Sequence, residues 1–448
     1  MPTPALPDLA AALLDAARKA GAEAADAMAI SDNALTIDLR QGRLEQAERS
    51  ESLEVGLRVL IGGRQACVSA SDTAPATLTA LAERAVAMAR EAPEDPSAGL
   101  ADAADLARGW DVAALELADD TPDPSAAALE AAARDLDSAA MAAGGVAQAE
   151  STAAFSRRAV FLAQSNGFAG GYGRTGHSRS VTAFCGTGTG MERDWAGETR
   201  THGADLPGAA SIGRLAAERA RARLGAVKPP TGRFPVVYDE RVAASLIGHL
   251  LSAINGSAIA RGASWARDLL GQPVLPPGLS LTEDPHRPRS GASRPFDAEG
   301  LPTAARALVQ DGVLQGWVLD LATARRLGLR STANASRGPG APPSPSTTNV
   351  DLTPGLQSRA DLLSAMSTGL LITGMIGQTI SPTTGDYSRG ASGYWVENGR
   401  ISHPVNECTV AGNLRDMLLR IVPANDARPH LSLRVPSLLI DGMTLAGA

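Results

Sequence analysis

The sequence is short of several features that define large functional classes. Its three cysteines, Cys67, Cys185 and Cys408, lie far apart and form no CxxC motif. This usage is typical of a reducing compartment rather than of a disulfide framework, so we expect a cytoplasmic protein. No run of about 18 apolar residues occurs, so we expect no transmembrane helix and no membrane partner. Residues 1–21 lack a basic start and include Asp8 and Asp15, which predicts a helix rather than a signal peptide.

Signals for nucleic-acid and nucleotide binding are also missing. The formal net charge is −7 and no block rich in Lys and Arg stands out, so we expect no nucleic-acid partner. The stretch GTGTG, residues 186–190, is followed by MERDW and not by an amphipathic helix, so it lacks the context of a dinucleotide-binding loop. No GxSxG motif is present. Cys408 falls in a predicted strand, where a buried structural thiol is the better interpretation.

What the chain does contain indicates many strands and turns. Aromatic residues make up only 3%, whereas 46 glycines and 29 prolines supply turn positions. Apolar and polar residues alternate over 35–39 and 53–59, and Gln41-Gly42 and Gly62-Gly63 are plausible turns after them. Helical spacing occurs near the N-terminus and from about Pro75 to Glu91. A further helix is expected after Asp123-Pro124, with the aspartate as its cap.

The second half gives similar turn signals and one expected mobile segment. Asp311-Gly312 and Asn398-Gly399 each stand between alternating segments, which strongly favours hairpins. The segment from Arg337 to Gly355 is rich in Pro, Gly and Ser, so we expect it to be mobile.

A domain boundary is predicted at the stretch GAVKPPTGR, residues 225–233. Two adjacent prolines cannot lie inside a helix, and the flanking Gly and Lys suit an exposed linker. We therefore predict two domains, residues 1–228 and 229–448. The first is expected to be an antiparallel sheet with helices and the second to be rich in strands, which makes the fold class α+β.

One predicted helix raises the question of a metal site. The stretch VAASLIGHLLSAING, residues 242–256, contains a single histidine, His249, in an otherwise apolar helix. A zinc-peptidase helix needs two histidines as ligands and a glutamate that activates water. The positions upstream that such residues would occupy hold Ala244 and Ser245. A single imidazole cannot hold zinc firmly, so we expect His249 to be structural.

A second weak metal candidate lies on a strand near the C-terminus. Simple alternation puts His403, Val405 and Glu407 on one strand face and Cys408 on the other. The histidine and the glutamate would chelate a metal only if a third ligand arrived from elsewhere. Solvent-facing polar residues are therefore the favoured interpretation.

The chain resembles the TldD/PmbA family, specifically its PmbA (TldE) branch, over nearly its whole length. The resemblance is carried by GRLEQAERSESLEVGLRVLIGGRQACVSASD (residues 42–72), SNGF, MERDWA and IGHLLSAINGSAIARGASWARDLLGQ (residues 247–272). The most specific stretches are FDAEGLPTAARALVQDGVLQGWVLDLATARRLGLRST (residues 296–332) and GDYSRGASGYWVENGRISHPVNECTVAGNL (residues 385–414).

The resemblance implies a peptidase complex of paired subunits and a barrel-like C-terminal domain. In this family the TldD-type subunit carries an HExxxH helix that binds zinc together with a cysteine near the C-terminus, and it cleaves unfolded or extended peptides. The matching positions here are Ala244, Ser245 and His249, with Val435 where the family often has cysteine. The resemblance thus implies no catalytic residue and no metal in this chain, and zinc in a TldD-like partner.

The same reading predicts how this subunit contributes. We expect it to complete the peptide cleft, with GDYSRGASGYW as a wall that pairs with peptide by strand addition. Asp386, Tyr387, Ser388 and Arg389 are the candidate peptide-binding residues. The alternative is a turn capped by Asp386 with Arg389 in solvent.

Two other functions stay open at this point. One is a self-sufficient metallopeptidase whose noncanonical ligands are His249, His403 and Glu407. The other is a homodimeric protein that binds peptides without hydrolysing them. The sequence selects neither the peptide nor the oligomeric state in isolation.

Overall fold

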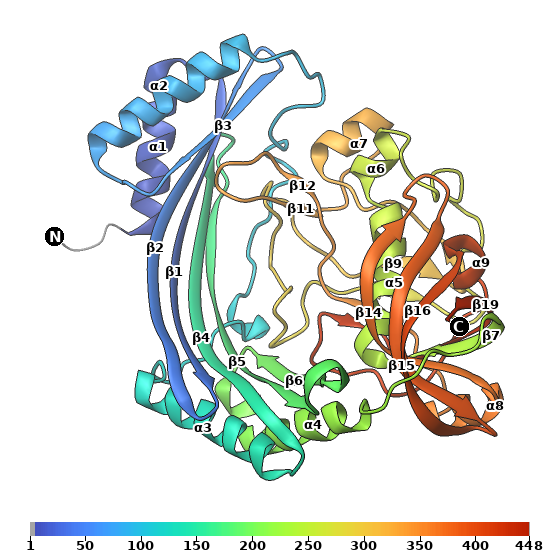
Figure 1. The fold of residues 1–448 in the computed structure, drawn as a ribbon. Helices are drawn as coiled ribbons and strands as arrows, with labels where there is room; N and C mark the ends of the chain where they lie inside the picture. Colours follow the sequence, from blue (N-terminus) through green and yellow to red (C-terminus); the bar gives the residue numbers. More distant parts are fainter. Residues whose placement is uncertain (1–4, 448) are drawn as a thin grey trace.

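The computed structural model describes residues 5–447, apart from the side chains of residues 378 and 379. The N-terminal half forms one antiparallel sheet of six strands in the order β3-β2-β1-β4-β5-β6. These strands are β1 (Ala24–Arg40), β2 (Arg43–Ile61), β3 (Arg64–Ala70), β4 (Val146–Gln164), β5 (Ala169–Cys185) and β6 (Glu192–Arg200). Figure 1 shows that the long strands bend together, so that one face of the sheet is concave toward the C-terminal half.

Two pairs of helices cover the other face of this sheet. They are α1 (Leu6–Ala20) with α2 (Pro75–Glu91), and α3 (Ala126–Ala142) with α4 (Ala209–Ala222). Ala27 and Ala29 of β1 pack with α1 and α2, whereas Ile37 and Leu39 farther along the strand pack with α3. Alternate residues of a strand share a face, so both helix pairs lie on the same side at opposite ends of the strands (Figure 1).

The two-residue turns predicted from the sequence are confirmed. Residues 41–42 join β1 to β2, and residues 62–63 join β2 to β3. Residues 311–312 and 398–399 form the corresponding turns of the second half. All eight residues have φ between 47° and 80°. Positive φ at both central positions characterises the type I′ turn, whose twist matches that of the paired strands.

Two local predictions are wrong. The third helix is capped by Ser125, whose Oγ accepts a hydrogen bond from the Ala128 amide at 3.2 Å. Asp123 does not cap it and instead forms an ion pair of 2.6 Å with Arg157. The segment from Arg337 to Gly355 is not a detached loop, because it contains short strands and the side chain of Arg337 is 0% exposed.

The C-terminal half is built around a closed five-stranded barrel. Its strands are β7 (Gly232–Tyr238), β14 (Gly369–Ile380), β15 (Asp386–Glu397), β16 (Arg400–Asn413) and β19 (Leu438–Ala446). They pair in the order β16-β15-β14-β7-β19, and β16 pairs again with β19 to close the sheet. The prediction of an α+β fold with a barrel-like C-terminal domain is confirmed, whereas the boundary between residues 228 and 229 stays a prediction.

Shorter elements surround the barrel. A second sheet contains β8 (Leu281–Glu283), β9 (Arg306–Gln310), β10 (Val313–Leu314), β13 (Val350–Leu352) and β18 (Leu433–Arg434). The remaining strands are β11 (Ala335–Ser336), β12 (Ser344–Pro345) and β17 (Val422–Pro423). The helices are α5 (Glu240–Ala253), α6 (Gly256–Ala260), α7 (Leu321–Leu327), α8 (Arg359–Met366) and α9 (Leu414–Leu418). No helix within residues 5–447 is long and apolar enough to cross a membrane.

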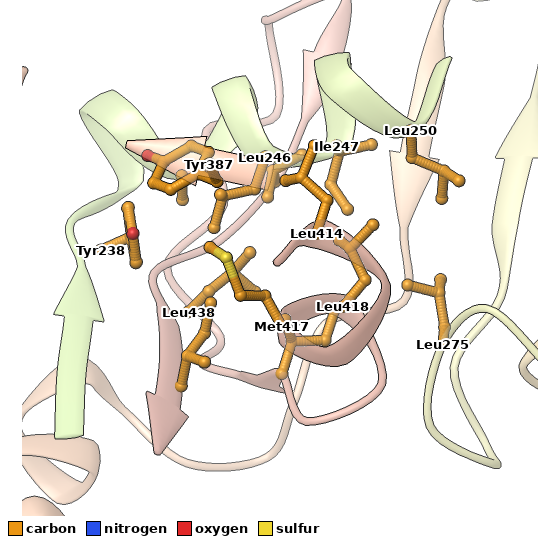
Figure 2. Packing of buried hydrophobic residues seen from close by; sticks show 14 of the residues in the cluster. Tyr238, Leu246, Ile247, Leu250, Leu275, Tyr387, Leu414, Met417, Leu418 and Leu438 are labelled. Atoms are coloured by element: carbon orange, nitrogen blue, oxygen red, sulfur yellow. The ribbon is translucent and has the colours of Figure 1, made fainter. Parts of the chain in front are cut away.

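Helix α5 anchors the largest hydrophobic core. Leu246, Ile247 and Leu250 are each 0% exposed, and Figure 2 shows them facing the side chains of α9 and Leu438. Residues three and four positions apart lie on one helix face, so this side of α5 packs in the core. Each fully buried side chain of this size contributes about 1.5–3 kcal/mol to folding.

Truncation within this core should destabilise the protein strongly. We expect Leu250→Ala to lower the free energy of unfolding by about 2–5 kcal/mol, because it removes buried contacts and leaves a cavity. Urea unfolding followed by circular dichroism measures the change. Leu356→Ala is the matched control, since that side chain is 97% exposed and its loss should shift stability by less than about 0.5 kcal/mol. Equal effects of the two substitutions would contradict the assigned core.

Candidate functional site

The face of α5 opposite its core holds the residues of interest. Asp239 caps the helix by accepting a hydrogen bond from the Arg241 amide at 3.2 Å. Ala244, Ser245, Gly248 and His249 then follow on the partly exposed side. A Cβ added at Gly248 would meet no atom within 4 Å, so this face borders open space. The helix therefore presents its motif positions on its partly exposed side.

His249 contacts an aromatic ring rather than a set of metal ligands. Its ring lies 6.0 Å from that of Tyr387 in an edge-to-face arrangement with an interplanar angle of 67°. Its Nε2 is buried without a hydrogen-bond partner among the described residues. Burial and, to a smaller extent, Arg389 lower the pKa of His249, which favours the neutral imidazole. This environment suits a packed histidine.

The other motif positions lack metal donors. Ser245 Oγ donates a 2.7 Å hydrogen bond to the Val242 carbonyl of its own helix. Ala244 packs at the edge of the core, and Val435 is 3% exposed within it. Residues 244, 245, 249 and 435 therefore supply one imidazole and no thiolate or carboxylate, and they do not fit a zinc ion.

The second metal candidate is rearranged by a β-bulge. Glu407 has φ +49°, and the pairing of β15 with β16 shifts register between Ala391 and Gly393. Val405 and Cys408 are consequently both buried, at 1% and 4% exposure, while Glu407 faces solvent. The prediction that His403, Val405 and Glu407 share a strand face is therefore wrong at Glu407.

These side chains have partners other than a metal. Glu407 forms an ion pair of 3.5 Å with Lys228, and His403 Nδ1 lies 3.1 Å from Ser402 Oγ. Within residues 5–447, no group of three or more His, Cys, Asp or Glu side chains is arranged to hold a metal ion. The structure thus does not bring His249, His403 and Glu407 together as one ligand set.

The candidate peptide-binding residues at the start of β15 are mostly engaged within the chain. Asp386 accepts hydrogen bonds from Thr384 Oγ1 at 2.6 Å and from Asn413 Nδ2 at 3.1 Å, and these contacts lower its pKa. Tyr387 is 2% exposed and belongs to the core. Arg389 Nε donates to the Gly377 carbonyl at 2.8 Å, and Ser388 is half-buried.

The backbone of β15 is not available for strand addition. β15 pairs with β14 on one side and with β16 on the other. Its amide and carbonyl groups are therefore used in the barrel over most of its length, and a peptide cannot add to it as a further strand. The prediction that GDYSRGASGYW pairs with peptide backbone is wrong for this reason.

A groove between the N-terminal sheet and the barrel offers a different binding surface. Its volume is about 930 Å³. One wall comes from β5 and β6 and the other from β14, β15 and β16, with these side chains among its lining: Phe184, Met191, Arg193, Trp195, Met375, Ile376, Ser392 and Thr409. Sequence reasoning missed the groove, because its two walls lie far apart in the chain.

The groove combines exposed apolar groups with two carboxylates of β6 that are already paired with arginines. Trp195 and Met191 are each 54% exposed and Ile376 is 76% exposed. Glu192 pairs with Arg223 at 3.4 Å, and Asp194 pairs with Arg241 at 3.3 Å. Exposed large apolar side chains gathered in a concave surface mark an interaction site more often than an ordinary surface.

Comparison with known proteins agrees with the resemblance noted from sequence. Models of the PmbA/TldA metallopeptidase match in three parts: domain 1 over residues 25–89, the central domain over 109–224 and the C-terminal domain over 231–447. "Metalloprotease PmbA" of Escherichia coli O157:H7 is 35% identical over 418 residues, which cover 92% of this chain and 90% of the relative. "Metalloprotease PmbA homolog" of Haemophilus influenzae is 33% identical and covers 97% and 94%.

Solved structures share the whole architecture. A Bacteroides thetaiotaomicron protein, described as a candidate modulator of DNA gyrase, superposes with a TM-score of 0.91 at 26% identity and covers 98% of each chain. TldE from Thermococcus kodakarensis superposes with a TM-score of 0.83, covering 98% of this chain and 100% of the other, and its 17% identity supports the fold alone. From the family models and the PmbA relatives together, the chain belongs to the PmbA/TldD metallopeptidase family.

Proposed function

We propose that this chain is the non-catalytic, TldE-like subunit of a metalloprotease complex that cleaves extended or unfolded peptides. A TldD-like partner would hold the zinc and carry out hydrolysis. The observation that carries the proposal is the donor set at residues 244, 245, 249 and 435, which contains one imidazole in place of the ligands that zinc needs. The three unpaired cysteines support a cytoplasmic location for the complex.

The role proposed for this chain is to complete the peptide cleft. The groove of about 930 Å³ is large enough for several residues of an extended chain, and its exposed Trp195 and Ile376 supply apolar anchors. An unfolded peptide exposes the apolar side chains that a folded protein buries. Recognition by such anchors would therefore favour extended substrates over folded ones.

The composition of the native complex tests this proposal first. The chain is tagged in its own cell and purified under native conditions, and the mass and zinc content are measured on one sample. We expect a heteromer with zinc in which the second subunit contains an HExxxH motif. A homomer with stoichiometric zinc would favour a self-sufficient metallopeptidase and contradict the proposal. A zinc-free homomer would favour a homodimeric peptide-binding protein.

Partial restoration of the motif should not produce a peptidase. We expect the double variant Ala244→His with Ser245→Glu to bind no stoichiometric zinc and to leave an unfolded peptide uncut, because Val435 still stands at the expected cysteine position. Zinc by mass spectrometry and cleavage by chromatography check this, with Ser245→Ala as the control variant. Zinc-dependent turnover by the double variant would count against the role assigned to Val435.

Loss of a groove anchor should weaken peptide binding without unfolding the chain. We expect Trp195→Ala to lower affinity for a labelled extended peptide by about tenfold or more, as truncation of an aromatic side chain that becomes buried on binding commonly does. Fluorescence anisotropy measures binding. Leu44→Ala is the control, because Leu44 is 49% exposed near the start of β2 and lines no part of the groove. Equal affinities of the two variants for the peptide would show that the groove is not the peptide-binding surface.

A further inference from the structure

A second cavity lies between the concave face of the sheet and the C-terminal half. Its volume is about 240 Å³. The apolar part of its lining comes from β1, β4 and a loop of the second half, with Met28, Ile30, Val160, Leu162 and Phe296. The volume is below the usual range of drug-sized pockets, which begins near 300 Å³, so it suits a group about the size of one residue.

Four arginines line this small cavity, against one carboxylate. They are Arg158, Arg174, Arg294 and Arg337, and the carboxylate is Asp297. Both oxygens of Asp297 are already engaged by backbone amides, those of Glu299, Leu301 and Ala335, at 2.9–3.0 Å. Burial raises the pKa of Asp297 to about 6 and raises that of nearby Glu299 as well. The lining of the cavity therefore carries more positive than negative charge.

Two of these arginines are neighbours on the sheet. Arg158 of β4 stands directly opposite Arg174 of β5, so their side chains project from the same face. Like charges directly opposite each other destabilise a sheet unless an anion compensates them. Arg158 forms an ion pair of 3.6 Å with Asp32. Arg174 donates to the carbonyls of Gly291 and Ser293, and within residues 5–447 no carboxylate lies within ion-pair distance of it.

The other two arginines line the cavity and carry buried donor atoms without partners. The side chain of Arg337 is 0% exposed, and its Nη1 pairs with Asp26. Its Nε and Nη2 are buried with no hydrogen-bond partner among the described residues, and the same holds for Arg294 Nε. Arg294 otherwise donates only to backbone carbonyls, those of Ala335 and Ser346. Buried donors without partners are costly, and an anion would satisfy them.

We propose that this cavity binds the C-terminal carboxylate of a peptide whose last residue is apolar. The guanidinium groups match the planar carboxylate, and the apolar lining accommodates the terminal side chain. The identity of the ligand as a peptide rests on the proposed function. The anionic, residue-sized character of the ligand rests only on the cavity.

A wider pocket gives such a peptide a path to the cavity. It has a volume of about 560 Å³ and shares Arg158 and Arg174 with the small cavity. Its other basic groups lie against carboxylates. Arg289 pairs with Glu116 at 2.5 Å, and Arg200 and His430 share Glu198, at 2.6 Å and 3.1 Å. The least compensated charge therefore lies at Arg158 and Arg174, where the wider pocket meets the inner cavity and where the chain would end.

The test compares a peptide with its own amide. Acetyl-Ala-Ala-Ala-Leu with a free carboxylate and the same peptide as a C-terminal amide are titrated into the full chain by calorimetry at low salt. We expect the acid to bind at least about tenfold more tightly, because charge-assisted hydrogen bonds form only with the carboxylate. Acetyl-leucine is the third ligand. Equal binding of acid and amide, or binding of acetyl-leucine as tight as that of the peptide, would overturn the proposal.

A matched pair of arginine variants locates the site. We expect Arg158→Gln to weaken binding of the acid by about fivefold and to leave the amide unchanged, because it removes one cationic donor. Arg158 anchors no loop, so the fold should persist. Arg179→Gln is the control, since Arg179 lies on β5, donates to the Pro207 carbonyl at 3.0 Å and lines neither cavity. Equal effects of the two variants would overturn the location.

This experiment is independent of the proposed role in a complex. Purification of the tagged Arg158→Gln chain should recover the same partner and zinc as the unchanged chain. If the native complex is instead a zinc-containing homomer, the proposed function fails. The difference in affinity between acid and amide still tests whether the cavity binds a carboxylate. If discrimination is absent from an intact heteromer, the cavity proposal alone fails.

Discussion

The structure depends on one buried ion cluster between its two halves. Asp26 of β1 is 0% exposed and pairs both with Arg58 of β2, at 2.6 Å, and with Arg337 from the C-terminal half. Removing one partner of a buried ion pair costs about 3–5 kcal/mol, because a charge stays behind without water. The same contact explains Gly56, where a Cβ would lie 2.1 Å from the Pro339 carbonyl oxygen. Residues 337–339 therefore pack directly against the sheet.

Docking of the two halves creates the concave surfaces that carry the proposed chemistry. The groove beside β6 and the arginine cavity each have one wall in the N-terminal sheet and another in the C-terminal half. Neither half alone would enclose them. Loss of the Asp26 contacts would consequently affect both surfaces together, because the same interface between the two halves encloses them. The interface fixes the geometry, and the side chains lining each surface decide what it binds.

The sequence predicted those features that depend on neighbours along the chain. The turns at residues 41–42, 62–63, 311–312 and 398–399 are predictable because positive φ favours glycine, asparagine and aspartate, which occupy every one of these positions except Gln41. The prediction failed where distant contacts decide. Arg337 lies in a segment whose composition indicates mobility, yet it is buried by its ion pair with a strand 311 residues away. Glu407 left its predicted strand face because of a bulge that simple alternation does not show.

The candidate site illustrates the same division on a single helix. On α5, Ala243, Leu246, Ile247 and Leu250 are each 0% exposed and hold the helix in the core, whereas Ala244, Ser245, Gly248 and His249 face the partly open side. The sequence shows that His249 is the only histidine of this helix. Its contact with Tyr387 could not be predicted, because the fold of the barrel brings Tyr387 of β15 to the helix. Because the two faces are separate, the chemistry of the open face can change while the packing that maintains the fold stays the same. A subunit without zinc ligands and a catalytic subunit can therefore share one architecture and differ in the residues on that open face.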